Sequence, residues 1–288
     1  MLHKERVARA VYYAMRRRIR NALGFRPRKT AAPILFYGMD AAIERHGWIV
    51  KSLLKHMPEE IDLRGKAACE VGAGDCLAAA SVFLKKGASK VNIVEIEPPA
   101  VNQSQLDVLK ALSAQGLPID LSIVRGDGDL KLDASRVAYH LCFMEDFKSE
   151  EQHEFLFSFS VMEHVEDLDR FYACCNRVMS PGARMLHLID LGGHEMFEDP
   201  IPPLDFQTYS DGLFNFMYPK YHRATRRFLD EHVEAVKKSG FRVVKVTPTR
   251  KADEKYLRNL WPQLRPAAQK RPFEEVQVVE FALLAQKQ

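Results

Sequence analysis

The spacing of apolar residues changes repeatedly along the chain between two patterns. Short, nearly continuous apolar runs predict buried strands, at 67–71, 90–96, 137–143, 155–160 and 185–189. Apolar residues at every third or fourth position predict helices, at 40–57, 77–86, 100–115, 168–178 and 232–239. This alternation of strand and helix predicts a doubly wound, Rossmann-like α/β fold with a mostly parallel sheet and helices on both faces.

Two parts of this pattern are less regular. The segments 241–246 and 276–284 are both β-rich, and no helix with a clear apolar stripe separates them. We therefore expect the seven-stranded sheet to end in an antiparallel last strand. Two segments, 119–124 and 137–143, compete for the third strand. We favour the second because it lies only a short loop before the fourth strand.

Residues 1–30 form a basic leader, and we place the domain proper at 31–288. The leader contains ten Lys or Arg residues and one acidic residue. Its apolar residues recur at helical spacing between the basic ones. Three interpretations are open: an amphipathic helix docked on the body or on a second subunit, one lying on an anionic membrane surface, and an organellar transit peptide. The apolar positions are Val7, Val11, Ala14, Met15, Ile19, Ala22 and Leu23.

Composition excludes several classes of protein. The formal net charge of the chain is +4, and residues 1–30 contribute +9. Residues 31–288 therefore carry −5 and offer no globally basic surface for nucleic acid. No apolar run approaches the ~20 residues of a membrane span. The five cysteines include no CxxC pair, which indicates reduced thiols in a cytoplasmic protein. The leader leaves open a peripheral position at the inner membrane surface.

The first predicted strand leads directly into a glycine turn. Residues 69–76 read C-E-V-G-A-G-D-C and precede the helix predicted at 77–86. Glycines at such a turn let a ligand approach the backbone, and the helix N-terminus offers it unpaired N–H groups. A nucleotide-like ligand is therefore expected here. A glycine signature alone is a weak signal, and the third glycine of a dinucleotide fingerprint is absent.

The run 70–76 resembles motif I of the class I S-adenosylmethionine-dependent methyltransferases, E/D-x-G-x-G-x-G, with Cys76 in place of the last glycine. The resemblance implies S-adenosylmethionine as cofactor and methyl transfer as activity. Three later segments resemble the same family, in the same order: V-E-I-E at 94–97, F-S-F-S-V-M-E-H-V-E-D at 157–167 and N-R-V-M-S-P-G-A at 176–183.

The resemblance implies roles within the cofactor site. In this family the carboxylate that opens motif I, here Glu70, helps to hold the methionine amine. Glu95, about 20 residues after the glycines, would accept both ribose hydroxyl hydrogens. At the adenine we favour Met144 and Glu145 over Asp127, which would then lie in an inserted loop. The cofactor-binding residues expected are Glu70, Gly72, Ala73, Gly74, Asp75, Cys76, Glu95, Ile96, Met144, Glu145 and Ser160.

Methyl transfer from a sulfonium is an in-line displacement, in which the protein positions the nucleophile and removes its proton where needed. His164 is one candidate base, because Glu163-His164 resembles the E-H pair of quinone-precursor O-methyltransferases. Some of those bind a divalent metal through E-x-x-E-H, but Ser160 replaces the first glutamate, so we predict no metal. Asp190 and His194 could instead form a base and its orienting partner. Packing for His164 and turn capping for Asp190 are the structural alternatives.

An aromatic insertion at about 190–228 follows the fifth strand, where the family often builds its acceptor lid. Tyr221, Arg223 and Arg226 are the candidate substrate-binding residues, because a cationic segment can meet a phosphate or carboxylate. The I-D-L-x-x-H segment at 189–194 also resembles methyltransferases of bacterial polysaccharide gene clusters. We therefore expect a small-molecule or glycan acceptor, methylated on a hydroxyl. An N- or C-methyltransferase of secondary metabolism and a non-catalytic cofactor-binding subunit are the alternatives.

Overall fold

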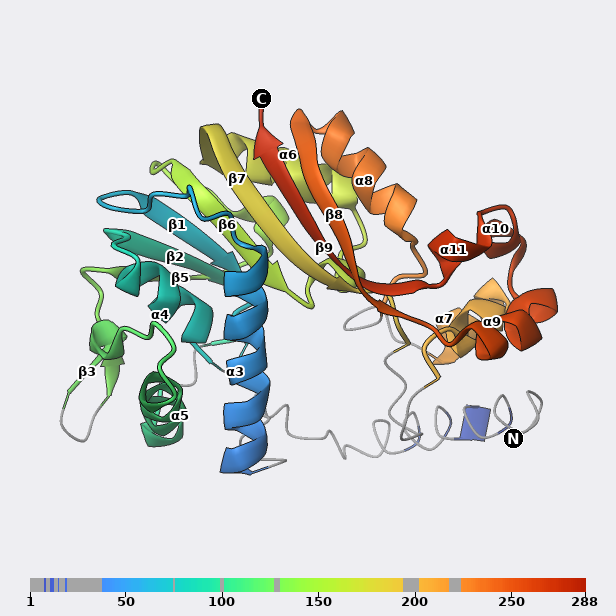
Figure 1. The fold of residues 1–288 in the computed structure, drawn as a ribbon, viewed down its shortest axis with the longest axis horizontal. Helices are drawn as coiled ribbons and strands as arrows, with labels where there is room; N and C mark the ends of the chain where they lie inside the picture. The colour runs from blue at the N-terminus through green and yellow to red at the C-terminus, as the bar shows by residue number, and fades with distance from the viewer. Residues whose placement is uncertain are drawn as a thin grey trace.

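The structure is a computed structural model that describes residues 38–74, 76–98, 101–126, 130–193, 202–217 and 224–288, with five isolated positions before them: Ala8, Val11, Tyr12, Met15 and Ile19. Its centre is a seven-stranded sheet in the order β5-β2-β1-β6-β7-β9-β8 (Figure 1). The strands are β1 (Ala67–Val71), β2 (Lys90–Glu95), β5 (Val137–Leu141), β6 (His153–Phe159), β7 (Met179–Asp190), β8 (Phe241–Lys251) and β9 (Val278–Lys287).

The strand directions confirm the expected Rossmann-like fold. β5, β2, β1, β6 and β7 are mutually parallel, whereas β9 runs antiparallel to both β7 and β8. The chain builds outward from β1 to one side and then returns to continue from β6 on the other. Ligands of doubly wound sheets bind outside the carboxyl ends of the strands at such a reversal, which here falls between β1 and β6.

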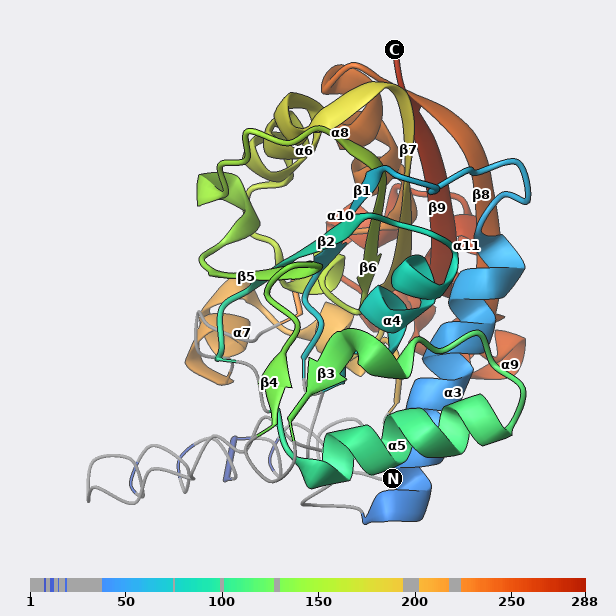
Figure 2. The ribbon, with the colours of Figure 1, turned by 90° about the vertical axis from the view of Figure 1, so that its left-hand side faces the viewer.

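Helices cover both faces of this sheet (Figures 1 and 2). On one face α3 (Met39–His56), α4 (Ala78–Lys85) and α5 (Gln103–Ala114) share an apolar core with the sheet. On the other face α6 (Leu168–Val178) and α8 (Leu229–Lys238) share a second core. The central strands are therefore buried on both sides, as a parallel sheet requires.

Strand β6 shows how one strand supplies both cores. Phe155 and Phe157 pack edge-to-face on Phe83 of α4, with ring centroids 5.6 and 6.3 Å apart. Leu156, between them in the sequence, belongs to the opposite core because successive side chains of a strand point to opposite faces. Burial on both faces is the reason that these strands are continuous apolar runs in the sequence.

The segment 119–124 is not a strand of the main sheet. Asp120 accepts a hydrogen bond of 3.0 Å from the backbone N–H two residues later, which favours a 3₁₀ turn at Leu121–Ile123. A small separate hairpin follows, made of β3 (Val124–Arg125) and β4 (Lys131–Leu132). β5 pairs with β2 instead, so the segment 137–143 supplies the third strand, as expected.

Between β8 and β9 the chain forms short helices that the apolar spacing does not predict. They are four to seven residues long, too short to show a periodic stripe. They pack around a small core of their own, which includes Leu204 from the insertion. The helices are α9 (Glu254–Leu260), α10 (Pro266–Gln269) and α11 (Phe273–Val276).

Residues 202–217 of the insertion contain helix α7 (Asp211–Met217). Several of its aromatic residues are buried against one another rather than facing a cavity. The members of this cluster are Phe206, Tyr209, Phe214 and Met217.

Val11 of the leader packs against the same cluster, which joins the leader to the insertion. Tyr12, Met15 and Ile19, the other large apolar leader residues that the structure describes, are each more than half exposed, at 61, 51 and 56%. Within the described residues, no helix combines the length and the apolar character needed to cross a bilayer.

Candidate active site

The chain turns sharply where β1 ends. Gly72 and Gly74 have φ angles of 74° and 62°, which residues with side chains rarely adopt. A Cβ on Gly72 would lie 2.2 Å from Cγ2 of Val161, whereas a Cβ on Gly74 would meet nothing within 4 Å. The first glycine thus permits close packing against the loop after β6, and the second faces open space. Ala73, between them, is half-buried.

Glu70, in β1 just before this turn, is 5% exposed, and its Oε2 accepts a hydrogen bond of 2.8 Å from the N–H of Ala80. Ala80 lies in the first turn of α4, whose N-cap residue Leu77 has no side chain that accepts a hydrogen bond. Glu70 therefore caps the helix from the neighbouring strand. Burial raises the pKa of Glu70 to about 8; the Ala80 N–H partly offsets this rise, and the charge of Glu95 adds to it.

Glu95 lies at the tip of β2, beside the turn. Its Oε2 accepts a hydrogen bond of 2.9 Å from the N–H of Gly74, and its Oε1 accepts one of 2.7 Å from the N–H of Ile96. The side chain is only half-buried, so it remains accessible. Glu97 takes a different place, with its backbone oxygen accepting a hydrogen bond of 2.8 Å from the hydroxyl of Tyr139. Of the two acids, Glu95 is the one joined to the turn.

Three large apolar side chains near Glu95 are exposed. Ile96 is 46% exposed, Leu141 60% and Phe143 50%. They lie at the ends of β2 and β5 at the same edge of the sheet, where Leu141, the last residue of β5, is the register partner of Glu95. An apolar patch beside polar groups suits a flat, mostly apolar ring. Ile96 is among the residues predicted at the cofactor. Met144, predicted at the adenine, is 3% exposed and belongs to the core beneath, so its contact with an adenine stays a prediction.

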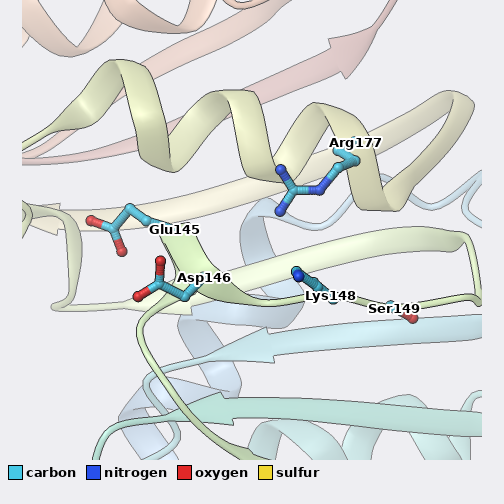
Figure 3. Close-up of a pocket in the computed structure, with 5 residues that line it drawn as sticks. All are labelled: Glu145, Asp146, Lys148, Ser149 and Arg177. Atoms are coloured by element: carbon cyan, nitrogen blue, oxygen red, sulfur yellow. The ribbon is translucent and has the colours of Figure 1, made fainter.

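Glu145 follows in a 3₁₀ turn that packs on α6. It lines a groove of about 580 Å³, and Figure 3 shows Arg177 reaching from α6 toward the segment that carries the other lining residues. Glu145 thus lies on the α6 side of the sheet edge, and its contact with an adenine stays a prediction. Asp127, the alternative, lies outside the described residues. The groove is lined by Glu145, Asp146, Lys148, Ser149 and Arg177.

The backbone at the end of β6 is unusual. Ser160 has a φ of 50°, a positive value that no other non-glycine residue in the described part of the chain shows. Its N–H donates a hydrogen bond of 2.9 Å to the carbonyl of Leu188. Such conformations cost on the order of 1–3 kcal/mol and cluster at ligand sites. The kink at Ser160 starts the loop that brings Val161 against Gly72.

Glu163, in the 3₁₀ turn Met162–His164, is only 1% exposed. Burial raises the pKa of its carboxyl well above the ordinary value, and the negative charge of Asp190 adds to the rise. Burial therefore favours the protonated form of this carboxyl. Sequence reasoning used Glu163 only as the neighbour of His164; an acidic residue within the apolar run V-M-E-H-V was the signal for a buried acid.

A cavity of about 630 Å³, a size suited to a small molecule, lies between α3 and the carboxyl ends of β6 and β7. Ser160, His164 and Asp190 all line it, so the structure brings two of the three predicted catalytic residues together. His194, the third, lies outside the described residues. In the part of the chain that is described, no group of three or more His, Cys, Asp or Glu side chains is arranged to hold a metal ion.

Asp190 is held by two neighbours. Its Oδ1 accepts hydrogen bonds from the N–H of Gly192 at 2.7 Å and from the guanidinium of Arg250 at 3.2 Å. Arg250 also contacts the carboxylate of Glu280, at 2.5 Å. The turn-capping role considered for Asp190 is therefore present, together with an ion pair that the sequence did not indicate.

Arg226 is 9% exposed and is engaged within the insertion. Its guanidinium donates a hydrogen bond of 2.5 Å to the carbonyl of Tyr209, pairs with Asp211 and lies 4.5 Å from the centre of the Phe214 ring. Contact between Arg226 and an acceptor stays a prediction. Three other predicted site residues lie outside the described part: Asp75, Tyr221 and Arg223. Cys76, by contrast, is described and buried.

A scan against protein-family models finds no match, and a search of curated proteins finds none. Among solved structures, an S-adenosylmethionine-dependent methyltransferase from Mesorhizobium loti is 14% identical with a TM-score of 0.47, over 87% of this chain and 100% of that one. Phosphoethanolamine N-methyltransferase 2 of Haemonchus contortus, in complex with S-adenosyl-L-methionine, is 16% identical with a TM-score of 0.47, over 87% of this chain and 57% of that one. A geranyl diphosphate methyltransferase is 15% identical with a TM-score of 0.46, over 84% of this chain and 77% of that one. These similarities concern the fold only.

Proposed function

We propose that this chain is an S-adenosylmethionine-dependent methyltransferase that methylates a hydroxyl of a saccharide or another small metabolite. The observation that carries the proposal is the hydrogen bond of 2.9 Å between Gly74 N–H and the Glu95 carboxylate. It joins the glycine turn after β1 to the tip of β2 at the carboxyl edge of the sheet. β1 also borders the reversal of strand order, beside which such sheets bind their ligands.

The residues around the turn fit each part of this cofactor. The open space at Gly74 admits a ligand close to the backbone. The half-buried carboxylate of Glu95 would accept the ribose hydroxyls. The buried carboxyl of Glu70 would face the charged amine once ionised. The adenine would pack on the exposed apolar side chains at the strand ends, which are Ile96, Leu141 and Phe143.

When bound, S-adenosylmethionine supplies a methyl group activated on a sulfonium. The task of the chain is to hold the nucleophile of the acceptor in line and to take its proton. His164 lines the cavity, and a neutral imidazole can accept a proton near neutral pH. Asp190 is a poorer base because it is paired with Arg250 at 3.2 Å. We therefore assign the role of general base to His164, with His194 as the other candidate.

The lining of the cavity supports a hydroxylated acceptor. The side chains of Ser52, Ser160 and Thr249 offer hydroxyl groups, and Glu280 offers a carboxylate beside them. These groups can donate and accept hydrogen bonds, as recognition of a polyhydroxylated molecule requires. If the leader contacts a membrane surface, it would bring the enzyme to a lipid-linked acceptor. If it contacts a second subunit, it would bring the enzyme to an acceptor held by that subunit.

The proposal is tested with cofactor that carries a labelled methyl group. The full chain is incubated with free saccharides, sugar phosphates, phenols and primary amines, and labelled products are identified by mass spectrometry. We expect label on a hydroxyl oxygen of one acceptor class. Label on nitrogen or carbon would replace the hydroxyl assignment by N- or C-methylation. Cofactor binding without any transfer would favour a non-catalytic subunit, and absence of cofactor binding would overturn the proposal.

A further inference from the structure

Helix α3 forms one wall of the acceptor cavity, and it places two cations there. Arg45 and Lys55 both line the cavity and are exposed. Neither side chain has a hydrogen bond or an ion pair with any residue that the structure describes. Cations left without carboxylate partners on a cavity wall are available to an anionic ligand.

The cavity side of α3 is one stripe of the helix. The lining positions 45, 48, 52, 55 and 56 recur at intervals of three or four residues, which is the spacing of one helical face. Lys51 is exposed as well, but it lies off this stripe and does not line the cavity. The same helix therefore offers a matched lysine for comparison.

The opposite wall carries two carboxylates that pair with a single cation, so their negative charge is partly neutralised. The carboxylates of Asp190 and Glu280 lie 3.2 and 2.5 Å from nitrogen atoms of one side chain, Arg250. Both acids are engaged by Arg250, and neither forms an ion pair with the cations of α3. The cavity is thus ion-paired on the sheet side and cationic on the helix side.

An aromatic pair separates the two ends of the cavity. Trp48 packs edge-to-face on Phe159, with ring centroids 5.1 Å apart, and Phe159 directly precedes Ser160. Trp48 therefore marks the level of the predicted reaction centre. Lys55 lies seven residues further along the helix, about 10 Å at the usual rise per residue. Arg45 lies on the other side of Trp48, about 15 Å from Lys55, so the two do not hold one small anion together.

We infer that the acceptor is an elongated anion whose carboxylate or phosphate binds Lys55, with the neighbouring His56 as a hydrogen-bond partner. The middle of the molecule packs on Trp48, and its nucleophile lies near Ser160 and His164. Arg45 contributes positive charge at the mouth. The position of the nucleophile rests on the proposed function, whereas the anion site stands on the cavity alone.

The test uses two matched pairs of phenolic probes and the fluorescence of Trp48. The chain has two tryptophans, so Trp261→Phe leaves Trp48 as the only reporter. One pair is 4-hydroxycinnamate and its methyl ester; the other is 4-hydroxyphenethyl phosphate and 4-hydroxyphenethyl alcohol. We expect Lys55→Gln to weaken binding of the anionic members about ten-fold and to leave the neutral members unchanged. The tighter of the two anionic probes identifies carboxylate or phosphate as the natural group.

Two control variants sharpen the result. Lys51→Gln should change nothing, and Arg45→Gln should weaken the anionic probes less than Lys55→Gln. Equal binding of anionic and neutral probes, no saturable binding of either anion, or equal losses in Lys51→Gln and Lys55→Gln would overturn the inference. Calorimetric titration with S-adenosylmethionine is run on the same proteins. Anion selectivity without cofactor binding would leave this site standing and remove the proposed function.

Discussion

The N–H of Gly74 donates a hydrogen bond of 2.9 Å to the carboxylate of Glu95, so the turn after β1 is joined to the tip of β2. The two residues are 21 positions apart in the sequence. This bond orients a carboxylate toward open space above the turn, and a hydroxylated ligand can then add to it without rearranging the backbone.

Glu95→Gln should weaken binding of S-adenosylhomocysteine, by about 1.5–3 kcal/mol, because an amide replaces a charged acceptor of two hydroxyl groups. Isothermal titration calorimetry measures the change. Glu97→Gln is the control, since Glu97 contributes its backbone oxygen rather than its carboxylate to the hydrogen bond with Tyr139. Equal affinity in the wild type and Glu95→Gln would remove Glu95 from the site.

Gly74→Asp should abolish cofactor binding and leave the protein folded. A Cβ at Gly74 meets no atom within 4 Å, so the cost to folding is limited to the strain of a side chain at positive φ. The new carboxylate would repel that of Glu95 in the space meant for the ligand. Gly116→Asp is a matched control, because Gly116 also has a positive φ, 81°, and open surroundings. Circular dichroism checks folding, and calorimetry checks binding. Retained affinity in Gly74→Asp would contradict the cofactor assignment.

Cofactor binding should release a proton from Glu70 near neutral pH. The pKa of Glu70 is raised to about 8, chiefly by burial, so its carboxyl is mostly protonated at pH 7. An ammonium group bound beside it favours the ionised form, and the proton leaves. Titration in buffers of different ionisation enthalpy counts the protons released. The release should fall above the raised pKa and vanish in Glu70→Gln; a binding enthalpy independent of buffer would argue against this contact.

His164→Ala should slow single-turnover methyl transfer by about 10²–10⁴-fold with little change in cofactor affinity, because it removes the base and not the binding site. His194→Ala is made in parallel. A large loss in His194→Ala with an intact rate in His164→Ala would move the base to the insertion. Full rates in both variants would show that neither histidine takes the proton.

Acid should destabilise the protein partly through His232. Burial lowers the pKa of His232 to about 3, with the charge of Arg227 and then His187 adding to the effect, whereas the unfolded chain titrates near 6.5. Between these values the unfolded state binds the extra proton, so the free energy of unfolding falls as the pH falls. His232→Leu should flatten this dependence by up to about 1.4 kcal/mol per pH unit in urea titrations. An unchanged slope would mean that His232 does not titrate on unfolding.

The positions of the strands along the chain and the glycine turn could be predicted from the sequence because each depends on local pattern. β1 and β6 are buried on both faces and therefore appear as apolar runs. The helix expected at 168–178 has those bounds, but the following strand begins at once, at Met179, and passes through Pro181 and Gly182. A proline and a glycine indicate a turn in sequence, yet here they lie in the less buried first half of a long strand.

The acceptor cavity could not be predicted, because it depends on how α3 crosses the sheet. The apolar stripe of α3 predicts a helix, but not that Trp48 and Lys55 face the ends of β6 and β7. The alternation of side chains along a strand likewise does not tell which set of side chains is buried where the strand ends at the edge of the sheet. Leu141 and Phe143 alternate with Cys142 and Met144, and only the structure tells which pair the core takes.

The contact between Gly72 and Val161 has a thermodynamic consequence. The turn at Gly72 and the loop after Ser160 fit so closely that a single added methyl group would stand 2.2 Å from the valine side chain. Neither segment can shift alone, so occupancy on one side of this contact changes the free energy of occupancy on the other. By linkage, the factor by which one ligand changes the affinity for the other is the same whichever of them binds first.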